Sequence, residues 1–225
     1  MHAPKNPALQ AGTVYGVVLN DRGSVERMGA ALTEAPYKAE PKAPILYIKP
    51  ANTFAADGAQ VILPGGAEKV EIGATLGVVM GRPASRVALE DAYAFIAGYI
   101  VAADLSLPHA SYYRPAIREK CFDGSCILGA PVAASRVSDP AGLNIRTTIN
   151  SIDADQFDLA GLVRGVPELL RDVSEFMTLS AGDVLLVGVK WQAPTAAPGD
   201  HVSVVSDVLG KIHFSIVPAR HREAA

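Results

Sequence analysis

The run AYAFIAGYIVAAD (residues 92–104) contains the longest apolar stretch of the chain, twelve residues that end at Asp104. A membrane-spanning helix needs about 20 apolar residues, so this run indicates a segment buried inside a globular protein. Residues 98–102 (GYIVA) predict a strand, because aromatic and β-branched residues favour extended chain. Just before them, residues 89–96 predict a helix, since Glu90 and Asp91 in its first turn would suit the helix dipole.

Outward from this run, Gly and Pro separate short segments rich in Val, Ile and aromatic residues. These segments predict strands at residues 13–19, 45–49, 75–80, 143–150, 184–189, 201–206 and 212–217, the last two as a hairpin around Gly210. Helices are predicted at residues 167–179, whose apolar face is typical of a core contact, and at residues 24–32. The pattern indicates a mostly β fold with a few helices, with one domain over residues 12–218 between tails 1–11 and 219–225.

Composition excludes several classes of protein. The 225 residues carry 20 Lys and Arg against 23 Asp and Glu, a net charge of −3, which argues against a nucleic-acid partner. No segment is apolar enough to span a membrane, and the first residues lack the apolar core of a signal peptide. Cys121 and Cys126 fit neither a CxxC pair nor a zinc set. We therefore expect no membrane partner and a cytoplasmic location.

The densest polar segment is DLSLPHASYYRPAIREKCFD (residues 104–123), directly after the predicted strand. Its Arg and Lys side chains suit a small dianion, because Arg offers a planar fork to a carboxylate and Lys a point charge. A solvated loop is the alternative. Asp104 would either cap a turn, the commoner role for such a residue, or hold a metal. His109 is the histidine of this segment, whereas His201 and His213 fall in the predicted hairpin and favour structural roles.

Other groups of polar residues are weaker candidates. Asp153, Asp155 and Asp158 lack the spacing of a calcium loop and favour a turn followed by a helix N-terminus. The chain contains no GxSxG, HExxH or GxGxxG motif.

At its polar segment the chain resembles the fumarylacetoacetate hydrolase family. The likeness extends over residues 12–217, and its motifs are specific together although each alone is weak. The motifs are LYIKPANT (46–53), GY (98–99) leading to DLS (104–106), YRP (113–115), KCFDG (120–124), and SEFMTL (174–179) before GD (182–183).

The resemblance implies a mixed β roll, in agreement with the predicted strands. It also implies a Mg²⁺ or Mn²⁺ ion held by a Glu-x-Glu pair and an Asp, where the ion binds a 2-oxo acid and stabilises an enolate. Asp104 matches the family's Asp, but Gly73 and Thr75 stand where the two glutamates belong. One carboxylate and a neutral hydroxyl predict weak or absent metal binding.

The resemblance places other site residues as well. It implies a substrate-binding set of Lys49, Tyr113, Arg114, Lys120 and Asp123. The family's acid–base histidine and glutamate are not matched, because Ser24 falls where the histidine would be. Glu26, one position off, and Asp104 are the weak catalytic candidates.

Two functional hypotheses follow from the resemblance. The segments PYK (36–38) and PK (41–42) look like those in the N-terminal half of a two-domain family member that decarboxylates and isomerises hydroxydienoate dicarboxylic acids in aromatic catabolism. The chain would then be a subunit of such an enzyme, as a homo-oligomer or in a heteromer. Alternatively, it is a non-catalytic partner of a metal-binding paralogue, or a small-acid binding protein of the same fold. The substrate class expected is a small 2-oxo dicarboxylic acid.

Overall fold

The computed structural model describes residues 11–109 and 111–219. In these ranges the chain forms a larger sheet with the order β2–β1–β11–β5–β6–β7–β3, in which β12 also pairs with β5 and β8 with β6. The strands of this sheet are β1 (Val14–Val18), β2 (Ile45–Lys49), β3 (Phe54–Ala55), β5 (Val70–Met80), β6 (Ile96–Ser106), β7 (Cys126–Leu128), β8 (Val132–Ala133), β11 (Val184–Leu186) and β12 (Thr195–Ala196).

The smaller sheet has the order β10–β9–β13–β14–β4. Its strands are β4 (Ala59–Ile62), β9 (Asn144–Ile149), β10 (Ile152–Asp158), β13 (His201–Ser206) and β14 (Gly210–Val217). Pairing is antiparallel except for the parallel pairs β1–β11, β3–β7 and β4–β14. The predicted mostly β fold, a mixed β roll with a few helices, is confirmed.

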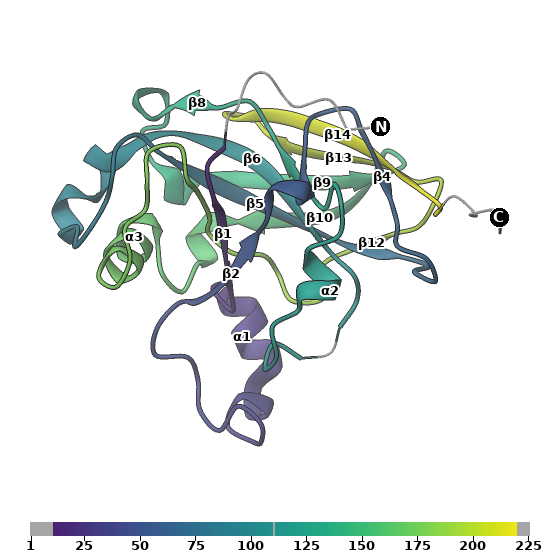
Figure 1. The fold of residues 1–225 in the computed structure, drawn as a ribbon, viewed down its shortest axis with the longest axis horizontal. Helices are drawn as coiled ribbons and strands as arrows, with labels where there is room; N and C mark the ends of the chain where they lie inside the picture. Colours follow the sequence, from purple (N-terminus) through teal and green to yellow (C-terminus); the bar gives the residue numbers. More distant parts are fainter. Residues whose placement is uncertain (1–10, 110, 220–225) are drawn as a thin grey trace.

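The strands β5 and β6 cross the molecule side by side as a long antiparallel pair (Figure 1). Both are buried along most of their length, so their sequences are nearly continuous apolar runs rather than alternating ones. Because β5 begins at Val70, it is longer than the predicted strand at residues 75–80. Strand β6 also extends beyond the predicted strand at residues 98–102, as far as Ser106, so Asp104 lies inside β6 and not after its end.

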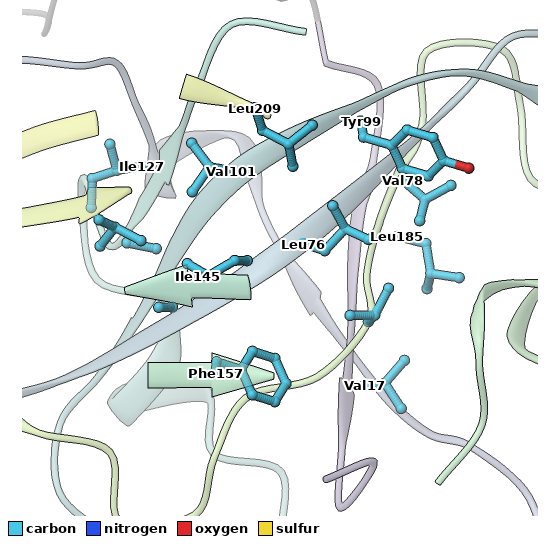
Figure 2. Packing of buried hydrophobic residues seen from close by; sticks show 14 of the residues in the cluster. Val17, Leu76, Val78, Tyr99, Val101, Ile127, Ile145, Phe157, Leu185 and Leu209 are labelled. Carbon is cyan, nitrogen blue, oxygen red and sulfur yellow. The ribbon is translucent and has the colours of Figure 1, made fainter. Parts of the chain in front are cut away.

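Apolar side chains from both sheets meet in one main core. Figure 2 shows Val78 of β5 close to Tyr99 of β6 and Leu185 of β11, and the same core contains Leu76, Val101, Ile145 of β9 and Phe157 of β10. All seven side chains are at most 1% exposed. This burial supplies the main driving force for folding at about 25 cal/mol per Å² of apolar surface.

Helices cover the ends and edges of the sheets. The α-helices are α1 (Arg22–Met28), α2 (Ile117–Lys120) and α3 (Val166–Ser174). The 3₁₀ helices are η1 (Gly29–Leu32), η2 (Ala51–Thr53), η3 (Leu89–Phe95), η4 (Ala134–Arg136), η5 (Pro140–Gly142) and η6 (Leu159–Gly161).

Three helix predictions are right in place and wrong in detail. The segment 24–32 divides at Gly29, whose φ of +45° ends α1 and starts η1. Residues 89–95 form a 3₁₀ helix instead of an α-helix, and strand β6 begins directly after it, at Ile96. The helix predicted at 167–179 ends at Ser174, and its last predicted residue, Leu179, instead forms a β-bridge with Ala84.

The interpretation of Asp153, Asp155 and Asp158 as a turn and a helix start is wrong in its main part. All three lie on β10, an edge strand most of whose residues are exposed. Only Asp158 caps a helix, accepting a hydrogen bond from the Ala160 N–H at the start of η6. Charged residues are common on edge strands, where they discourage pairing with other chains.

The predicted tails 1–11 and 219–225 fall outside the described residues, apart from residues 11 and 219 themselves. Within the described part, no helix is long and apolar enough to cross a membrane.

The α3 helix offers a direct test of the core. Leu170 is 0% exposed on its inner face, whereas Phe176, just beyond the helix, is 67% exposed. We expect Leu170→Ala to lower the free energy of unfolding by about 2–5 kcal/mol, because it leaves a cavity. Phe176→Ala, the control, should change it by less than about 1 kcal/mol. Urea denaturation measures both, and equal losses would contradict this packing.

Candidate functional site

The β5–β6 ladder brings the family's metal positions together. Gly73 pairs with Asp104, and Thr75 pairs with Ala102. Side chains two residues apart share one face of a strand, so Glu71, Gly73 and Thr75 all lie on the face of Asp104. The strand register therefore brings positions 73, 75 and 104 together, as the family resemblance implies for its metal ligands. Whether a metal ion can bind there depends on the side chains at these positions.

Asp104 is an internal ion-pair centre. Its Oδ1 lies 2.9 Å from Lys49 Nζ and its Oδ2 lies 2.7 Å from Lys120 Nζ. The Tyr47 hydroxyl also donates a hydrogen bond to Oδ2. Asp104, Lys49 and Lys120 are 1%, 0% and 4% exposed, so these charges are shielded from water. The two alternatives considered for Asp104, a turn cap or a metal ligand, did not include this arrangement.

Lys49 is held by several oxygen atoms. Its ammonium donates to the Leu105 carbonyl at 3.3 Å, to the Ser125 hydroxyl at 3.0 Å and to the Lys120 carbonyl. These three acceptors account for its three hydrogens. The contact with Asp104 Oδ1 is therefore an ion pair without hydrogen-bond geometry, and that oxygen has no hydrogen-bond donor among the described residues.

The charges set the protonation state of the centre. Burial by itself would raise the pKa of Asp104, but Lys120 and Lys49 outweigh it and lower the pKa to about 2. Burial, together with the Asp104 charge, raises the pKa of the Tyr47 hydroxyl, which therefore stays protonated and can donate. With Asp104 ionised and both lysines protonated, the three groups carry a formal net charge of +1.

Glu71 and Tyr112 lie at the edge of this centre. Burial raises the pKa of the half-buried Glu71 carboxyl, and the nearby Lys120 partly offsets the rise. Burial, then the charges of Glu71 and Asp104, raise the pKa of the Tyr112 hydroxyl. Lys120 Nζ also lies 4.5 Å from the centre of the Tyr47 ring. Lys120 thus pairs with a buried carboxylate and lies over an aromatic face, and its charge acts on the half-buried Glu71 carboxyl.

The structure brings together only part of the predicted substrate set. Lys49 and Lys120 meet at Asp104, whereas Tyr113, Arg114 and Asp123 are exposed. Tyr113 packs edge-on against Tyr37, with ring centres 6.2 Å apart, and Asp123 accepts a hydrogen bond of 2.7 Å from Asn52. These three side chains make none of the ion pairs of the Asp104 centre, and their substrate role stays a prediction.

The α1 region shows no acid–base pair among its described residues. Glu26 is exposed on α1. Ser24 is buried, donates to Asp21 Oδ2 at 2.5 Å and accepts from the Trp191 N–H at 2.8 Å. Since Asp21 caps α1 through the Ser24 N–H, these contacts stabilise the helix start.

The residues present do not fit a divalent cation held as the family resemblance implies. A Cβ atom at Gly73 would lie 2.6 Å from the Asp104 carbonyl and 2.8 Å from Val189 Cγ1, so a longer side chain has no room. The Thr75 hydroxyl donates to the Gly188 carbonyl at 2.6 Å. Among the described residues, no group of three or more His, Cys, Asp or Glu could hold a metal ion. Weak metal affinity stays a prediction to be measured.

Tyr47 and Glu71 complete the centre, and neither belongs to the predicted substrate-binding set. The signal for Tyr47 was its position two residues before Lys49 in the strand ILYIK, because alternate residues share a face. For Glu71 the signal was its position two residues before Gly73 on β5, which puts both residues on the same face of the strand.

Comparisons with known proteins give a consistent picture. The family model described as fumarylacetoacetate (FAA) hydrolase C-terminal matches residues 13–217. The chain is 41% identical, over 93% of its length, to the 4-hydroxyphenylacetate degradation bifunctional isomerase/decarboxylase of Escherichia coli, and covers 48% of that protein. It therefore spans about half the length of this curated relative.

Solved structures show the same fold. The 5-carboxymethyl-2-hydroxymuconate delta-isomerase from Mycobacterium smegmatis has a TM-score of 0.79 and 26% identity, over 94% of this chain and 81% of the other. The fumarylpyruvate hydrolase from Pseudomonas aeruginosa, solved with Mn²⁺ and pyruvate, has a TM-score of 0.80 over 96% of this chain and 98% of the other. At 23% identity, the second likeness shows the fold alone.

The ion-pair centre can be tested through stability. Asp104→Asn leaves two buried ammonium groups without a carboxylate, so we expect a loss of about 3–5 kcal/mol at pH 7. In the wild type, the pKa of about 2 means that Asp104 adds stability above its unfolded pKa near 4. This contribution, about 2 kcal/mol, should disappear as the pH falls from 4 to 2. Urea unfolding between pH 2 and 7 measures it.

The matched control for this experiment is Asp155→Asn. Asp155 pairs with Lys190 at 2.7 Å, but both side chains are partly exposed. We expect a loss of about 0–1 kcal/mol at this pair. If both asparagine variants lost the same stability, the Asp104 centre would not have the role described.

Gly73 gives a steric test. We expect Gly73→Ala to destabilise the protein by about 1–3 kcal/mol, because its Cβ would overlap the Asp104 carbonyl and Val189. Gly65→Ala is the control, since a Cβ there meets no atom within 4 Å, and it should shift stability by less than about 1 kcal/mol. Thermal unfolding measures both variants, and a neutral Gly73→Ala would show that the site has room for a side chain.

Proposed function

The chain belongs to the fumarylacetoacetate hydrolase family, and from this premise we propose that it is a subunit of an isomerase/decarboxylase of 4-hydroxyphenylacetate (homoprotocatechuate) degradation. The substrate class would be small 2-oxo dicarboxylic acids of the hydroxydienoate type. The similarity to a bifunctional isomerase/decarboxylase over almost the whole chain supports this proposal. Because the chain spans about half of that relative, a second family domain would complete the active unit.

In this unit the chain would be the partner that carries no catalytic metal. Two observations support this role. Gly73, which pairs with Asp104 across the β5–β6 ladder, has no room for a longer side chain. The two carboxylate oxygens of Asp104 already lie next to the ammonium groups of Lys49 and Lys120. A hard divalent cation needs several oxygen ligands, preferably anionic, and this face offers Asp104, already paired with two lysines, and the half-buried Glu71. Without the ion, the main electrophile for an enolate is missing, and electrostatic stabilisation is usually a large share of catalysis.

The chain's own residues would act on the substrate through charge and shape. We place Arg114 and Tyr113 at the entrance, because both are exposed on the segment that leads into α2. Arg114 can form a two-point contact with a carboxylate of the substrate. Lys49 and Lys120 would keep the interior beside this entrance positively charged, which favours dianions over neutral compounds.

A catalytic function of the single chain and an acid-binding function are the competing proposals. The first would need an acid–base group, for which Glu71 beside Lys120 is a better placed candidate than the exposed Glu26. The second would need affinity for a dicarboxylate without turnover in any assembly.

The deciding experiment measures turnover of 5-carboxymethyl-2-oxohex-3-enedioate by absorbance and carbon dioxide release. The purified chain is assayed alone with Mn²⁺, and then mixed with a family paralogue that retains the Glu-x-Glu pair. We expect little turnover by the chain alone and a stable complex with higher turnover in the mixture, measured against the paralogue alone. Full turnover by the chain alone would overturn the partner role, and binding without turnover in every mixture would favour the acid-binding function.

A further inference from the structure

A cavity lies on the other face of β6 from the Asp104 centre. Its volume is about 210 Å³, and it is lined by Tyr93, Tyr99, Ala134, Val137, Ser138 and Pro140. Side chains alternate along a strand, so Tyr99 and Asp104, five residues apart on β6, point to opposite faces. None of the lining residues belongs to the ion-pair centre, and the proposed function does not use this cavity.

Tyr99 forms the inner wall of the cavity. The residue is 1% exposed, and its ring packs in the main core (Figure 2). Its hydroxyl makes no hydrogen bond to another residue in the described part of the chain. A buried tyrosine hydroxyl usually has a hydrogen-bond partner, because leaving it unpaired costs free energy. The partner of this hydroxyl would therefore come from the cavity.

Tyr93 of η3 forms the outer wall and is 50% exposed. Burial, then the charges of Asp139 and Glu168, raise the pKa of its hydroxyl, so both carboxylates act on this wall. Asp139 lies in the sequence between two lining residues, Ser138 and Pro140. The lining itself contains no Lys or Arg. The cavity therefore offers hydroxyl oxygens and aromatic rings in a negative field.

We propose that this cavity binds a small organic cation, a primary ammonium group carried on an aromatic or apolar body. An ammonium group has three donors and no acceptor, so it can donate to the hydroxyls of Tyr99 and Ser138. Tyrosine rings attract cations over their faces. A cavity of about 150 Å³ holds benzene, so this one has room for a single ring with a short chain.

An acid of the same size would be disfavoured here. A carboxylate could accept from the hydroxyl groups, but Asp139 and Glu168 would repel its charge. The dicarboxylates of the proposed function therefore do not suit this cavity. The inference goes beyond that function and stands whether or not the chain takes part in the isomerase/decarboxylase.

The test compares three probes that share a phenyl ring and a two-carbon chain: phenethylammonium, phenylacetate and 2-phenylethanol. Binding is measured by titration with saturation-transfer NMR at pH 7. We expect phenethylammonium to bind with a dissociation constant of about 1 mM, and the acid and the alcohol to bind at least about tenfold more weakly. Equal affinity for all three probes, or no binding of phenethylammonium at about 10 mM, would overturn the proposal.

Two variants locate the binding site. Tyr99→Phe keeps the ring and removes the hydroxyl, so it should weaken phenethylammonium binding by about tenfold, the cost of a hydrogen bond to a charged group. Tyr15→Phe is its control, because Tyr15 lies on β1 and does not line the cavity. Asp139→Asn can still accept the hydrogen bond from the Ala141 N–H that caps η5, but loses the charge, and should weaken binding by about two- to fivefold.

Asp155→Asn, which removes a carboxylate outside the cavity, should leave the affinity unchanged. If Tyr99→Phe does not fold, Ala134→Leu takes its place, since a longer side chain at this partly buried position would fill the cavity and abolish binding. Phenethylammonium affinity that stays at the wild-type value in Tyr99→Phe or in Ala134→Leu would show that the cation binds elsewhere and would overturn the proposal. Turnover assays of the proposed function do not enter this result.

Discussion

The Asp104 ion-pair centre is the constraint on which the surrounding structure depends. One carboxylate on β6 holds a lysine from α2, the next element along the chain, and a lysine from β2, which is distant in the sequence. Removing ions from water costs several kcal/mol each, so such a group persists only where its partners are in place. The centre therefore requires that β2 and α2 are positioned against β6 before the fold is complete.

The apolar core makes this placement possible. The long β5–β6 pair is buried on both faces, with the smaller sheet packed against one of them, and it fixes Asp104 opposite Gly73 by backbone hydrogen bonds alone. The absence of a side chain at Gly73 lets Val189 approach the Asp104 backbone closely. The same absence removes a carboxylate from the place where the family resemblance puts one. A single glycine thus connects the packing of this region with its chemistry.

The electrostatic consequence is a change in the type of site. Gly73 and Thr75 stand where the resemblance places two glutamates, so the charged groups left on this face are two lysines, Asp104 and the half-buried Glu71, whose formal charges sum to zero when all are ionised. Such a site has its counter-ions built into the chain. Its charge does not depend on metal supply, and under the proposed function the enolate chemistry that a metal ion supports would belong to the second domain of the assembly.

The sequence by itself determined the mostly β fold, the approximate positions of most of the longer strands and helices, and the presence of Asp104 without its two glutamates, but it did not predict the seven-residue strand β10. These features follow from local patterns of apolar residues and from motif positions, which a linear sequence displays directly. It did not reveal the two- to four-residue strands such as β3, β7 and β12, because segments so short become strands only when a partner strand is beside them. Nor could it show that Lys49 and Lys120 share Asp104, or that Gly73 has no space for a side chain. Those facts depend on distances between residues far apart in the chain, and only the tertiary structure sets such distances.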